Sequence, residues 1–375
     1  MRLDELDYSL PPELIAQVPV EPRDAARLLV VRGEGACLAC DDRTFSDLPG
    51  LLRAGDVLVR NDTRVVPARA RFRKPTGGRV ELLFLERVAD PKPGSAEGVE
   101  EIWEALVRGR LRAGETLRSE AAPDELAVRV EASLGEGRYR VRPVGAAVEP
   151  LVALLDRYGE TPLPPYIRTA LADPERYQTV FARPRGSAAA PTAGLHFTAG
   201  LDAALAATGV TIEHLTLHVG LATFRPVTAA RLEDHPLHDE PFVVDRAALR
   251  RIAGARADGR RLVAVGTTMV RLLEELGAAG LLDPASSGGH AAGVAANGGP
   301  PLVGRTGLFI TPGHRFVAID GLITNFHLPR TSLLALVMAF CGVEETRRIY
   351  AHAIAARYRF YSFGDAMLAF RATAP

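Results

Sequence analysis

The 375-residue chain has few cysteines and no long apolar run. Its three cysteines, Cys37, Cys40 and Cys341, are too few and too unevenly spaced for a disulfide framework or a zinc ribbon. The longest apolar candidate, residues 332–342, is too short to span a bilayer, and the first residues carry acids instead of an apolar signal core. These absences argue against a disulfide-stabilised secreted module and against a helical membrane protein. We therefore expect a cytoplasmic location and no membrane partner.

The chain also lacks an excess of charge of either sign, since 45 lysines and arginines face 45 aspartates and glutamates. An even balance neither favours nor excludes a nucleic-acid partner. A local basic strip nevertheless lies between residues 60 and 79, where one acid, Asp62, stands among Arg60, Arg64, Arg69, Arg71, Arg73, Lys74 and Arg79. Such a strip suits phosphate binding even in a neutral chain, and the alternative is a solvated β-ribbon. The sequence leaves both interpretations open.

The order of the predicted elements indicates two domains, as the length also suggests. Short strands are predicted at 69–74, 79–87, 102–107, 126–130 and 138–142, and glycine turns between them are typical of a small antiparallel barrel. On both sides strands alternate with helices, including an opening helix from residue 11, a helix at 198–208 and strands at 308–311 and 316–323. We expect an α/β fold, with a main domain at 1–67 and 151–375 and an inserted small antiparallel β-barrel at 68–150.

Residues 191–198 (PTAGLHFT) form the most distinctive motif, at the start of a helix that Thr198 caps. Small residues such as Gly194 let a ligand approach the backbone, and the unpaired N–H groups at a helix start suit a carboxylate or phosphate. His196 then lies where an acid, a base or a hydrogen-bond donor is useful. The alternative is an ordinary helix start with a core histidine.

Two further segments place polar residues directly after predicted strands. Residues 266–268 (GTT) form a strand–glycine–helix junction that resembles an anion-binding turn, although it lacks the glycine spacing of a dinucleotide or P-loop fingerprint. Asn325 and His327 carry donors and acceptors suited to a purine edge or to ribose hydroxyls. Asp365, after Gly364, is a candidate ribose-binding acid. Helix capping and turn formation explain the same residues without a ligand.

Histidines gather near another predicted strand end. His218 stands beside Gly220, and His235, His238 and Glu240 follow within a short segment. Their spacing matches no metal motif, so we expect proton transfer and no metal cofactor. Polarity of a surface loop is the alternative.

The order of these motifs along the chain resembles that of the S-adenosylmethionine:tRNA ribosyltransferase-isomerase family of queuosine biosynthesis. The matching segments span nearly the full length and comprise residues 14–17 (LIAQ), 21–24 (EPRD), 61–65 (NDTRV), 162–167 (PLPPYI), 176–179 (RYQT), 191–198 (PTAGLHFT), 218–220 (HVG), 266–268 (GTT), 322–329 (LITNFHLP) and 364–368 (GDAML). The eight-residue match at 191–198 is the most specific of them.

The resemblance implies an α/β domain with an inserted β-barrel, in agreement with the pattern of elements. It also implies that the ribosyl group of S-adenosylmethionine is transferred and isomerised onto a 7-aminomethyl-7-deazaguanine base in tRNA, giving epoxyqueuosine-tRNA, adenine and methionine. Such chemistry needs a base near the 5′ carbon of the donor and an acid that helps adenine to leave, but no metal or covalent nucleophile. The implied partners are S-adenosylmethionine and tRNA, and we expect a monomer or weak oligomer.

Expected roles follow for individual residues. The base is expected to be His196 or, as second choice, His238 oriented by Glu240, and the full catalytic set is His196, His238, Glu240 and His218. The methionine carboxylate is expected at the helix start after Gly266 or Thr198, and the full donor-binding set is Thr192, Gly194, Gly266, Thr267, Thr268, Asn325, His327 and Asp365. The expected RNA-binding residues are Asn61, Asp62, Arg64, Arg71 and Arg73.

Several positions depart from the family's usual pattern. Leu221 and Ala222 follow His-Val-Gly where the family has Ala-Gly, Met269 replaces a serine, Leu237 a methionine and Thr311 a tyrosine. These changes are expected near the acceptor, so two alternatives stay open. One is a paralogous enzyme that uses S-adenosylmethionine on a small nucleoside or another acceptor, and the other is a non-catalytic RNA-binding protein. The basic strip favours tRNA over a small acceptor, and the set of histidines disfavours a purely RNA-binding role.

Overall fold

The computed structural model describes residues 2–33, 35, 38–88, 101–144, 150–220, 232, 239–283 and 299–371. The chain divides into two compact units. The first comprises Met1–Arg64, Pro164–Pro184 and Ala190–Pro375, and the second comprises Val65–Leu163 and Arg185–Ala189. Within the described ranges, no helix combines the length and the apolar character needed to cross a membrane.

The first unit is built on a mixed sheet whose described strands follow the order β15-β13-β12-β3-β14-β16-β17-β1-β2. These strands are β1 (Arg27–Arg32), β2 (Ala39–Thr44), β3 (Val57–Asn61), β12 (Thr211–Leu217), β13 (Glu240–Val244), β14 (Leu262–Val265), β15 (Leu302–Thr306), β16 (Gly321–Asn325) and β17 (Ala366–Phe370). The four neighbours β12, β3, β14 and β16 are parallel, whereas β17 is antiparallel to β16. The carboxyl ends of the four parallel strands therefore meet at one edge of the sheet, where open α/β sheets bind ligands.

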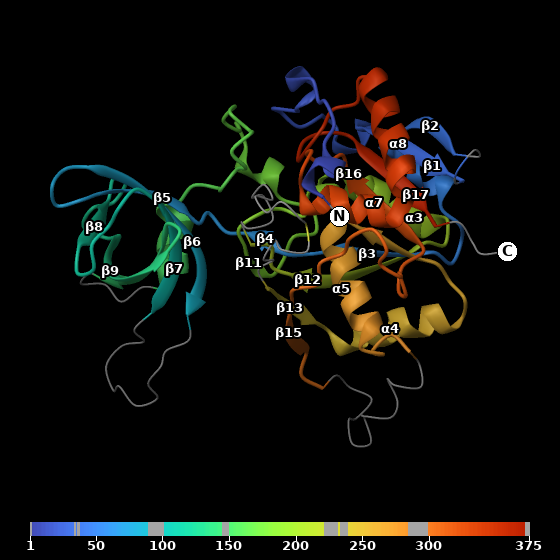
Figure 1. Ribbon diagram of the computed structural model, residues 1–375. Helices are drawn as coiled ribbons and strands as arrows, with labels where there is room; N and C mark the ends of the chain where they lie inside the picture. The colour runs from blue at the N-terminus through green and yellow to red at the C-terminus, as the bar shows by residue number, and fades with distance from the viewer. Residues whose placement is uncertain are drawn as a thin grey trace. The chain divides into compact units, whose positions relative to one another are not determined.

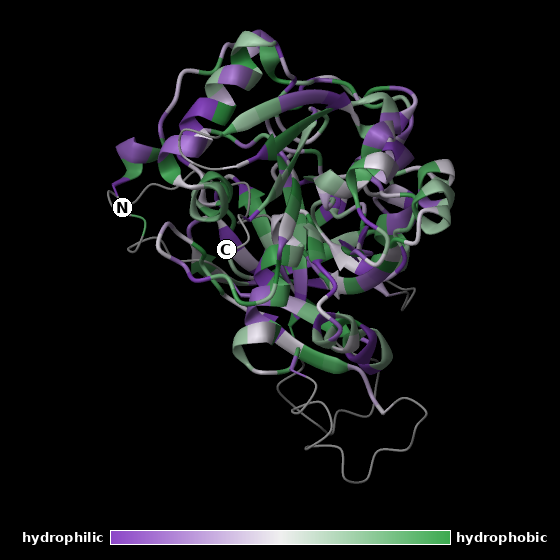
Figure 2. Ribbon diagram, turned by 90° about the vertical axis from the view of Figure 1, so that its right-hand side faces the viewer, coloured by the Kyte–Doolittle hydropathy of each residue, from purple (hydrophilic) through white to green (hydrophobic). Residues whose placement is uncertain are grey.

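Helices cover both faces of this sheet (Figure 1). Helices α1 (Leu48–Leu51) and α3 (Ala199–Ala207) pack on one face, where Leu58 and Val263 of the sheet share a buried cluster with Phe197 and Leu201. In Figure 1 the opposite face carries α4 (Arg246–Ala257), α5 (Thr267–Ala278), α7 (Ser332–Cys341) and α8 (Val343–Ala355). Hydrophobic residues are concentrated on the central strands, as the colouring of the ribbon in Figure 2 shows.

Short 3-10 turns complete the first unit: Leu3–Leu6, Pro12–Leu14, Arg23–Ala25, Phe45–Asp47, Pro174–Tyr177 and Thr192–His196. Side-chain caps set the starts of α3 and α4, as their sequence predicts. Thr198 accepts the N–H of Leu201 at 3.1 Å and so begins α3, and Asp245 accepts the N–H of Ala247 at 3.1 Å and so begins α4. Local sequence thus fixes where these helices begin.

The second unit contains a closed antiparallel barrel in the order β10-β7-β6-β5-β8-β9. Its strands are β5 (Arg69–Arg73), β6 (Arg79–Val88), β7 (Ile102–Arg108), β8 (Thr116–Ser119), β9 (Ala127–Gly135) and β10 (Arg138–Val144), followed by α2 (Leu151–Tyr158). Strand β5 alternates as its sequence requires, because Ala70 and Phe72 are buried while Arg71 and Arg73 are exposed. Two short strands, β4 (Arg64–Val65) and β11 (Arg185–Ser187), pair with each other. The prediction of an α/β fold with an inserted antiparallel barrel is confirmed.

Several element predictions are wrong in detail. The opening helix is only the 3-10 turn Pro12–Leu14, because the backbone of Leu14 and Ala16 pairs with Phe360 instead of continuing a helix. Residues 308–311 form no strand, since the N–H of Leu308 bonds to the Thr306 hydroxyl and its carbonyl accepts from Arg271. The strand expected at 316–323 begins only at Gly321, and β8 and β17 were not predicted.

Candidate active site

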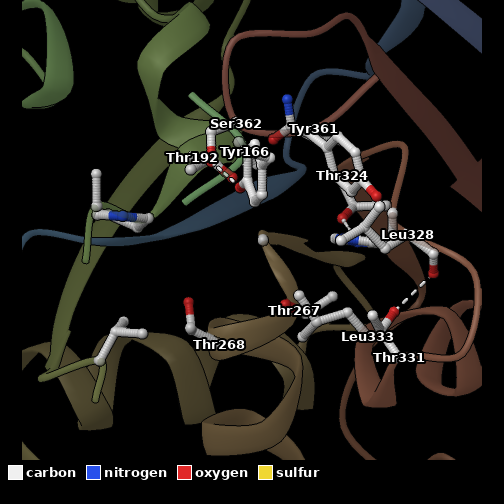
Figure 3. Close-up of a pocket in the computed structure, with 17 residues that line it drawn as sticks. Tyr166, Thr192, Thr267, Thr268, Thr324, Leu328, Thr331, Leu333, Tyr361 and Ser362 are labelled. Carbon is white, nitrogen blue, oxygen red and sulfur yellow. Dashed lines mark hydrogen bonds between the residues drawn. The ribbon is translucent and has the colours of Figure 1, made fainter. Parts of the chain in front are cut away.

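A pocket lies at the carboxyl ends of the parallel strands in the first unit. Its lining includes residues 190–193, the start of α5 at 266–268, and residues after β16 such as His327. Thr267 and Thr268 lie on one side of it, and Tyr166, Tyr361 and Ser362 lie on the other (Figure 3). Six residues of the expected donor-binding set line this pocket: Thr192, Gly266, Thr267, Thr268, Asn325 and His327.

The start of α5 has the geometry of an anion site. Gly266 is the N-cap residue with φ 88° and ψ 152°, a backbone conformation that is essentially restricted to glycine. The N–H groups of a helix's first turn have no partner within the helix, and the helix dipole favours negative charge there. The other helix start considered above, at Thr198, lies outside this pocket, and the Thr198 hydroxyl donates to Asp24 at 2.9 Å. The start of α5 is therefore the better carboxylate site.

Asn61 belongs to the turn that supports the pocket. It is 1% exposed, and its amide bonds to both the N–H and the carbonyl of Leu217 at the end of β12. Its Oδ1 also accepts from the N–H of Thr63, whose hydroxyl lies 2.8 Å from His218 Nδ1. Asp62 accepts from the Thr216 hydroxyl, and burial raises its pKa. Residues 61–63 thus position the end of β12. The burial of Asn61 gives no support to its expected contact with RNA.

His196 is buried and lies outside this pocket. It is 5% exposed, its ring lies 4.9 Å from that of Phe45, and it lines a second, smaller cavity with Arg23 and Arg359. Its Nε2 lies 3.1 Å from the amide nitrogen of Asn325, which does line the pocket. Burial lowers the pKa of His196 to about 3, so the ring is neutral near pH 7. Its role as the base stays a prediction.

Two other histidines of the expected site, His327 and His218, are described by the structure. His327 lines the pocket, with Nε2 2.8 Å from the Thr324 hydroxyl and a pKa that burial lowers to about 3. His218 is half-buried with a pKa lowered by burial, and only its neighbour Val219 lines the pocket. His235 and His238 lie outside the described residues, so the second choice for the base has no structural description.

Glu240 forms a buried ion pair with Arg271 of α5, and the two side chains are 6% and 7% exposed. Its second oxygen accepts from the N–H of Gly220 at 3.0 Å. Arg271 also donates to the carbonyls of Leu308 and Thr306. Both carboxylate oxygens of Glu240 therefore hold the segment after His218 against α5. Within the described ranges no cluster of three or more metal-ligating side chains exists.

Two members of the donor-binding set lie outside the pocket lining. A Cβ on Gly194 would lie 2.9 Å from Thr179 and 3.0 Å from Phe181, so close packing alone explains this glycine. Asp365 is 2% exposed, and its carboxylate accepts from the backbone N–H groups of Arg27 and Arg359. These contacts organise the loop before β17.

The arginines of the basic strip are paired with acids or buried. Arg71 bonds to Glu160 at 3.0 Å and Arg73 to Glu120 at 3.1 Å, and both arginines are more than half exposed. Arg64 pairs with Glu175, and Arg60 is 2% exposed against Asp202. Surface pairs of this kind contribute only about 0–1 kcal/mol, so Arg71 and Arg73 remain free to exchange a carboxylate for a phosphate.

Tyr166, Tyr361 and Ser362 are among the pocket residues that sequence reasoning missed. The rings of Tyr166 and Tyr361 stack with centroids 4.5 Å apart, and the Tyr166 hydroxyl lies 2.7 Å from the Ser362 hydroxyl. Tyr166 lies in the matched segment 162–167, which is a signal that was present but not assigned to the site. No local pattern distinguishes Tyr361, because its place depends on the chain folding back beside β16.

The departures from the family pattern do not gather in the described pocket. Met269 is fully buried within α5, and Thr311 is half-buried outside the pocket lining. Leu221, Ala222 and Leu237 lie outside the described residues. The described departures therefore leave the pocket lining unchanged.

Comparisons with known proteins agree with this arrangement. A family model described as queuosine biosynthesis protein matches residues 3–369. An S-adenosylmethionine:tRNA ribosyltransferase-isomerase from Anaeromyxobacter sp. (strain Fw109-5) is 51% identical, over 99% of this chain and 100% of that protein. One of the same name from Moorella thermoacetica is 48% identical, over 98% and 99%.

A solved structure also resembles the chain. The crystal structure of an S-adenosylmethionine tRNA ribosyltransferase from Thermotoga maritima is 32% identical, with a TM-score of 0.51, and the likeness covers 98% of this chain and 100% of that one. The family model and the relatives extend over nearly the whole length, barrel and main unit alike. The chain therefore belongs to the queuosine biosynthesis protein family.

Proposed function

We propose that the chain transfers and isomerises the ribosyl group of S-adenosylmethionine onto a 7-aminomethyl-7-deazaguanine base in tRNA, giving epoxyqueuosine-tRNA, adenine and methionine. The observation that carries this proposal is the full-length likeness to relatives that bear the name of this activity, at 51% and 48% identity. Because the likeness covers both units, it supports the whole reaction and not only donor binding.

The pocket supports the donor half of the proposal. The start of α5, with Thr267 and Thr268, suits the methionine carboxylate. Thr192, Asn325 and His327 offer polar groups for the rest of the molecule. We assign donor binding to these residues and to Gly266, which permits the turn.

Proton transfer needs a base near the donor's 5′ carbon, and an unprotonated imidazole suits that role near pH 7. We assign the base to one member of the set His196, His218 and His238, with Glu240 acting through the Gly220 backbone that it holds. Burial lowers the pKa of His196 and of His218, so both described members are unprotonated near pH 7. The substitutions of His196 proposed below separate it from the others.

The acceptor half rests on the tRNA named for the relatives. We assign phosphate contacts to the exposed Arg71 and Arg73, with Arg64 as a further candidate. The active form is proposed to be a monomer or weak oligomer, which sedimentation velocity would test.

The decisive experiment incubates the protein with S-adenosylmethionine, with and without tRNA that carries 7-aminomethyl-7-deazaguanine, and analyses the products by mass. The proposal requires adenine, methionine and the modified nucleoside, all dependent on that tRNA. Adenine release that is independent of tRNA, with transfer to a small nucleoside, would establish the paralogous activity instead. RNA binding without any product would leave only an RNA-binding role.

A further inference from the structure

Two pocket residues carry buried polar atoms that have no hydrogen-bond partner in the described part of the chain: Asn325 Oδ1 and Tyr361 Oη. The residues are 2% and 5% exposed. Buried polar groups in folded proteins almost always have partners, so an unpaired atom in a pocket residue indicates a partner supplied by a ligand. The two atoms therefore mark places for polar contacts with a bound molecule.

Hydrogen bonds within the protein decide which end of the Asn325 amide stays free. Its Nδ2 lies 3.1 Å from His196 Nε2 and donates to the carbonyl of Asp365 at 3.4 Å. A backbone carbonyl can only accept, so the end of the Asn325 amide that faces Asp365 is its nitrogen, and His196 Nε2 accepts from that same nitrogen. The ring therefore carries its hydrogen on Nδ1 and accepts at Nε2. Both amide hydrogens of Asn325 are used, and Oδ1 remains as an acceptor.

His196 has the contacts of a residue that orients Asn325. Its Nε2 is engaged by the Asn325 amide, and its ring packs against Phe45. A proton accepted at Nε2 would break the bond to Asn325 and place a charge in a fully buried position. Proton transfer through His196 would thus disturb the pocket residue that it holds.

Tyr361 is held in the pocket by an unusual backbone conformation. Its φ is 75°, a left-handed value that is rare for residues other than glycine and that is found mainly where function requires it. Its N–H bonds to the carbonyl of Phe326 at 3.0 Å, and its ring stacks on Tyr166. Burial raises the pKa of Tyr361, so its hydroxyl stays protonated and can donate. Tyr361 lies across the pocket from Thr267 (Figure 3).

We propose that Asn325 and Tyr361 bind the adenosine part of S-adenosylmethionine, with Asn325 Oδ1 accepting from an N–H or O–H of the ligand, and that His196 is a positioning residue for the Asn325 amide. This inference rests on the proposed function. The start of α5 suits the carboxylate at the other end of the same ligand. Asn325 Oδ1 and the Tyr361 hydroxyl suit the amino and hydroxyl groups of a nucleoside. The stacked rings of Tyr166 and Tyr361 form a flat aromatic wall that suits its base.

The first test measures S-adenosylmethionine affinity by calorimetry, and KM and kcat in the tRNA assay, for Asn325→Leu and Tyr361→Phe. Each substitution should weaken binding about tenfold, the effect of one lost hydrogen bond in a buried site. Thr179→Val is the matched control, because Thr179 Oγ1 is also buried and unpaired but Thr179 does not line the pocket. Unchanged affinity in both pocket variants would overturn the proposal. Absence of binding by the unaltered protein would instead contradict the proposed function.

The second test separates positioning from proton transfer by His196. His196→Gln keeps an acceptor near the Asn325 amide but cannot act as the base, whereas His196→Phe keeps a ring beside Phe45 and removes the acceptor. Positioning predicts affinity and kcat within a few-fold of the unaltered protein for Gln, and about tenfold weaker binding for Phe. The Phe substitution should add nothing when Asn325 is already leucine.

A loss of about 100-fold or more in kcat for His196→Gln, with donor affinity unchanged, would make His196 the base and overturn its positioning role. Thermal denaturation of each variant identifies any that fail to fold. If His196→Phe does not fold, the Gln variant alone decides between the two roles.

Discussion

Single residues in the interior connect the pocket to the segments around it, and Glu240 is one of them. Its carboxylate lies between Arg271 of α5 and the backbone of Gly220, so two oxygens join two segments far apart in sequence. A charge this deeply buried is tolerated only with a partner and hydrogen bonds. Glu240 therefore has a clear structural reason to be an acid, whether or not it also orients His238.

Glu240→Ala should lower the free energy of unfolding by about 3–5 kcal/mol, because it leaves the Arg271 guanidinium buried without its countercharge. Urea denaturation at pH 7 measures this. Arg43→Ala is the control, since the exposed Arg43–Asp41 pair contributes about 1 kcal/mol or less. Equal effects of the two substitutions would mean that the buried pair is no more important for stability than a surface one.

Buried histidines predict a stability that falls with acid. The pKa values of His196 and His327 are lowered to about 3 by burial, whereas an unfolded histidine has its ordinary value of about 6.5. The unfolded chain therefore binds protons first as the pH falls. The free energy of unfolding is therefore at its full value above about pH 6.5. Below that pH it falls progressively, by about 2 kcal/mol per histidine between pH 7 and pH 5.

Urea denaturation at pH 7 and pH 5 tests this sign, and most carboxylates titrate below that window. His327→Gln should remove about 2 kcal/mol of the pH dependence, because one of the strongly shifted histidines is gone and His196 and His214 remain. A pH dependence of the same size in the variant would show that His327 titrates normally in the folded chain.

At the scale of elements, the junction between β14 and α5 places the expected carboxylate site. Gly266→Ala should lower the free energy of unfolding by about 1–3 kcal/mol and raise KM for S-adenosylmethionine, because alanine avoids φ 88° and the first turn of α5 would shift. A Cβ there would meet only ordinary contacts at 3.6 and 3.7 Å, so the backbone conformation alone accounts for the expected loss.

Gly254→Ala is the matched control within α4. A Cβ at Gly254 would have no neighbouring atom within 4 Å beyond the backbone of its own helix, and the residue has no left-handed φ. Alanine should therefore stabilise this helix by about 0.5–1 kcal/mol. Urea denaturation and steady-state kinetics of both variants give the comparison. A Gly266→Ala protein with unchanged stability and KM would contradict the role assigned to the turn.

At the scale of the whole molecule, the pocket belongs to one compact unit while Arg71 and Arg73 belong to the other. Because each arginine already bonds to a glutamate, its contact with RNA would be an exchange of one anion for another. The affinity for tRNA should fall as salt rises, and replacing both arginines by alanine should make the slope of log affinity against log salt less steep by about 1.4–1.8. S-adenosylmethionine binding should be unchanged.

The partner glutamate gives a test of opposite sign. Glu120 pairs with both Arg73 and Arg79, so Glu120→Ala frees two guanidinium groups and should strengthen tRNA binding at low salt. Filter binding over a salt series measures both effects. Equal slopes for the double arginine variant and the unaltered protein would remove these arginines from the RNA contacts.

Much of the fold follows from the sequence, because its signals are local. Alternation along β5 and side-chain caps at Thr198 and Asp245 depend on neighbours only a few residues away. The expected site was found in the same way where strands end, at Gly266 and Asn325, since parallel strands bring their carboxyl ends to one edge.

Other parts of the structure depend on pairing between distant segments. Strand β17 has no alternating pattern of its own and is defined by its place between β16 and β1. The stretch 308–311 has the apolar character of a strand, but Arg271 and Thr306 take its backbone bonds. Short apolar stretches carry too little periodicity to decide such cases, and burial against partners decides them.

The sequence by itself determined the family, the two-part α/β-and-barrel architecture and six of the residues that line the pocket. Only the tertiary structure decided which of those residues contact one another. His196 and Asn325 are 129 residues apart, and their contact leaves Asn325 Oδ1 without a partner among the described residues. Tyr361 reaches the same pocket through a left-handed turn that no local pattern announces. The number and direction of hydrogen bonds to a side chain depend on all of its neighbours in space, and a sequence shows only those along the chain.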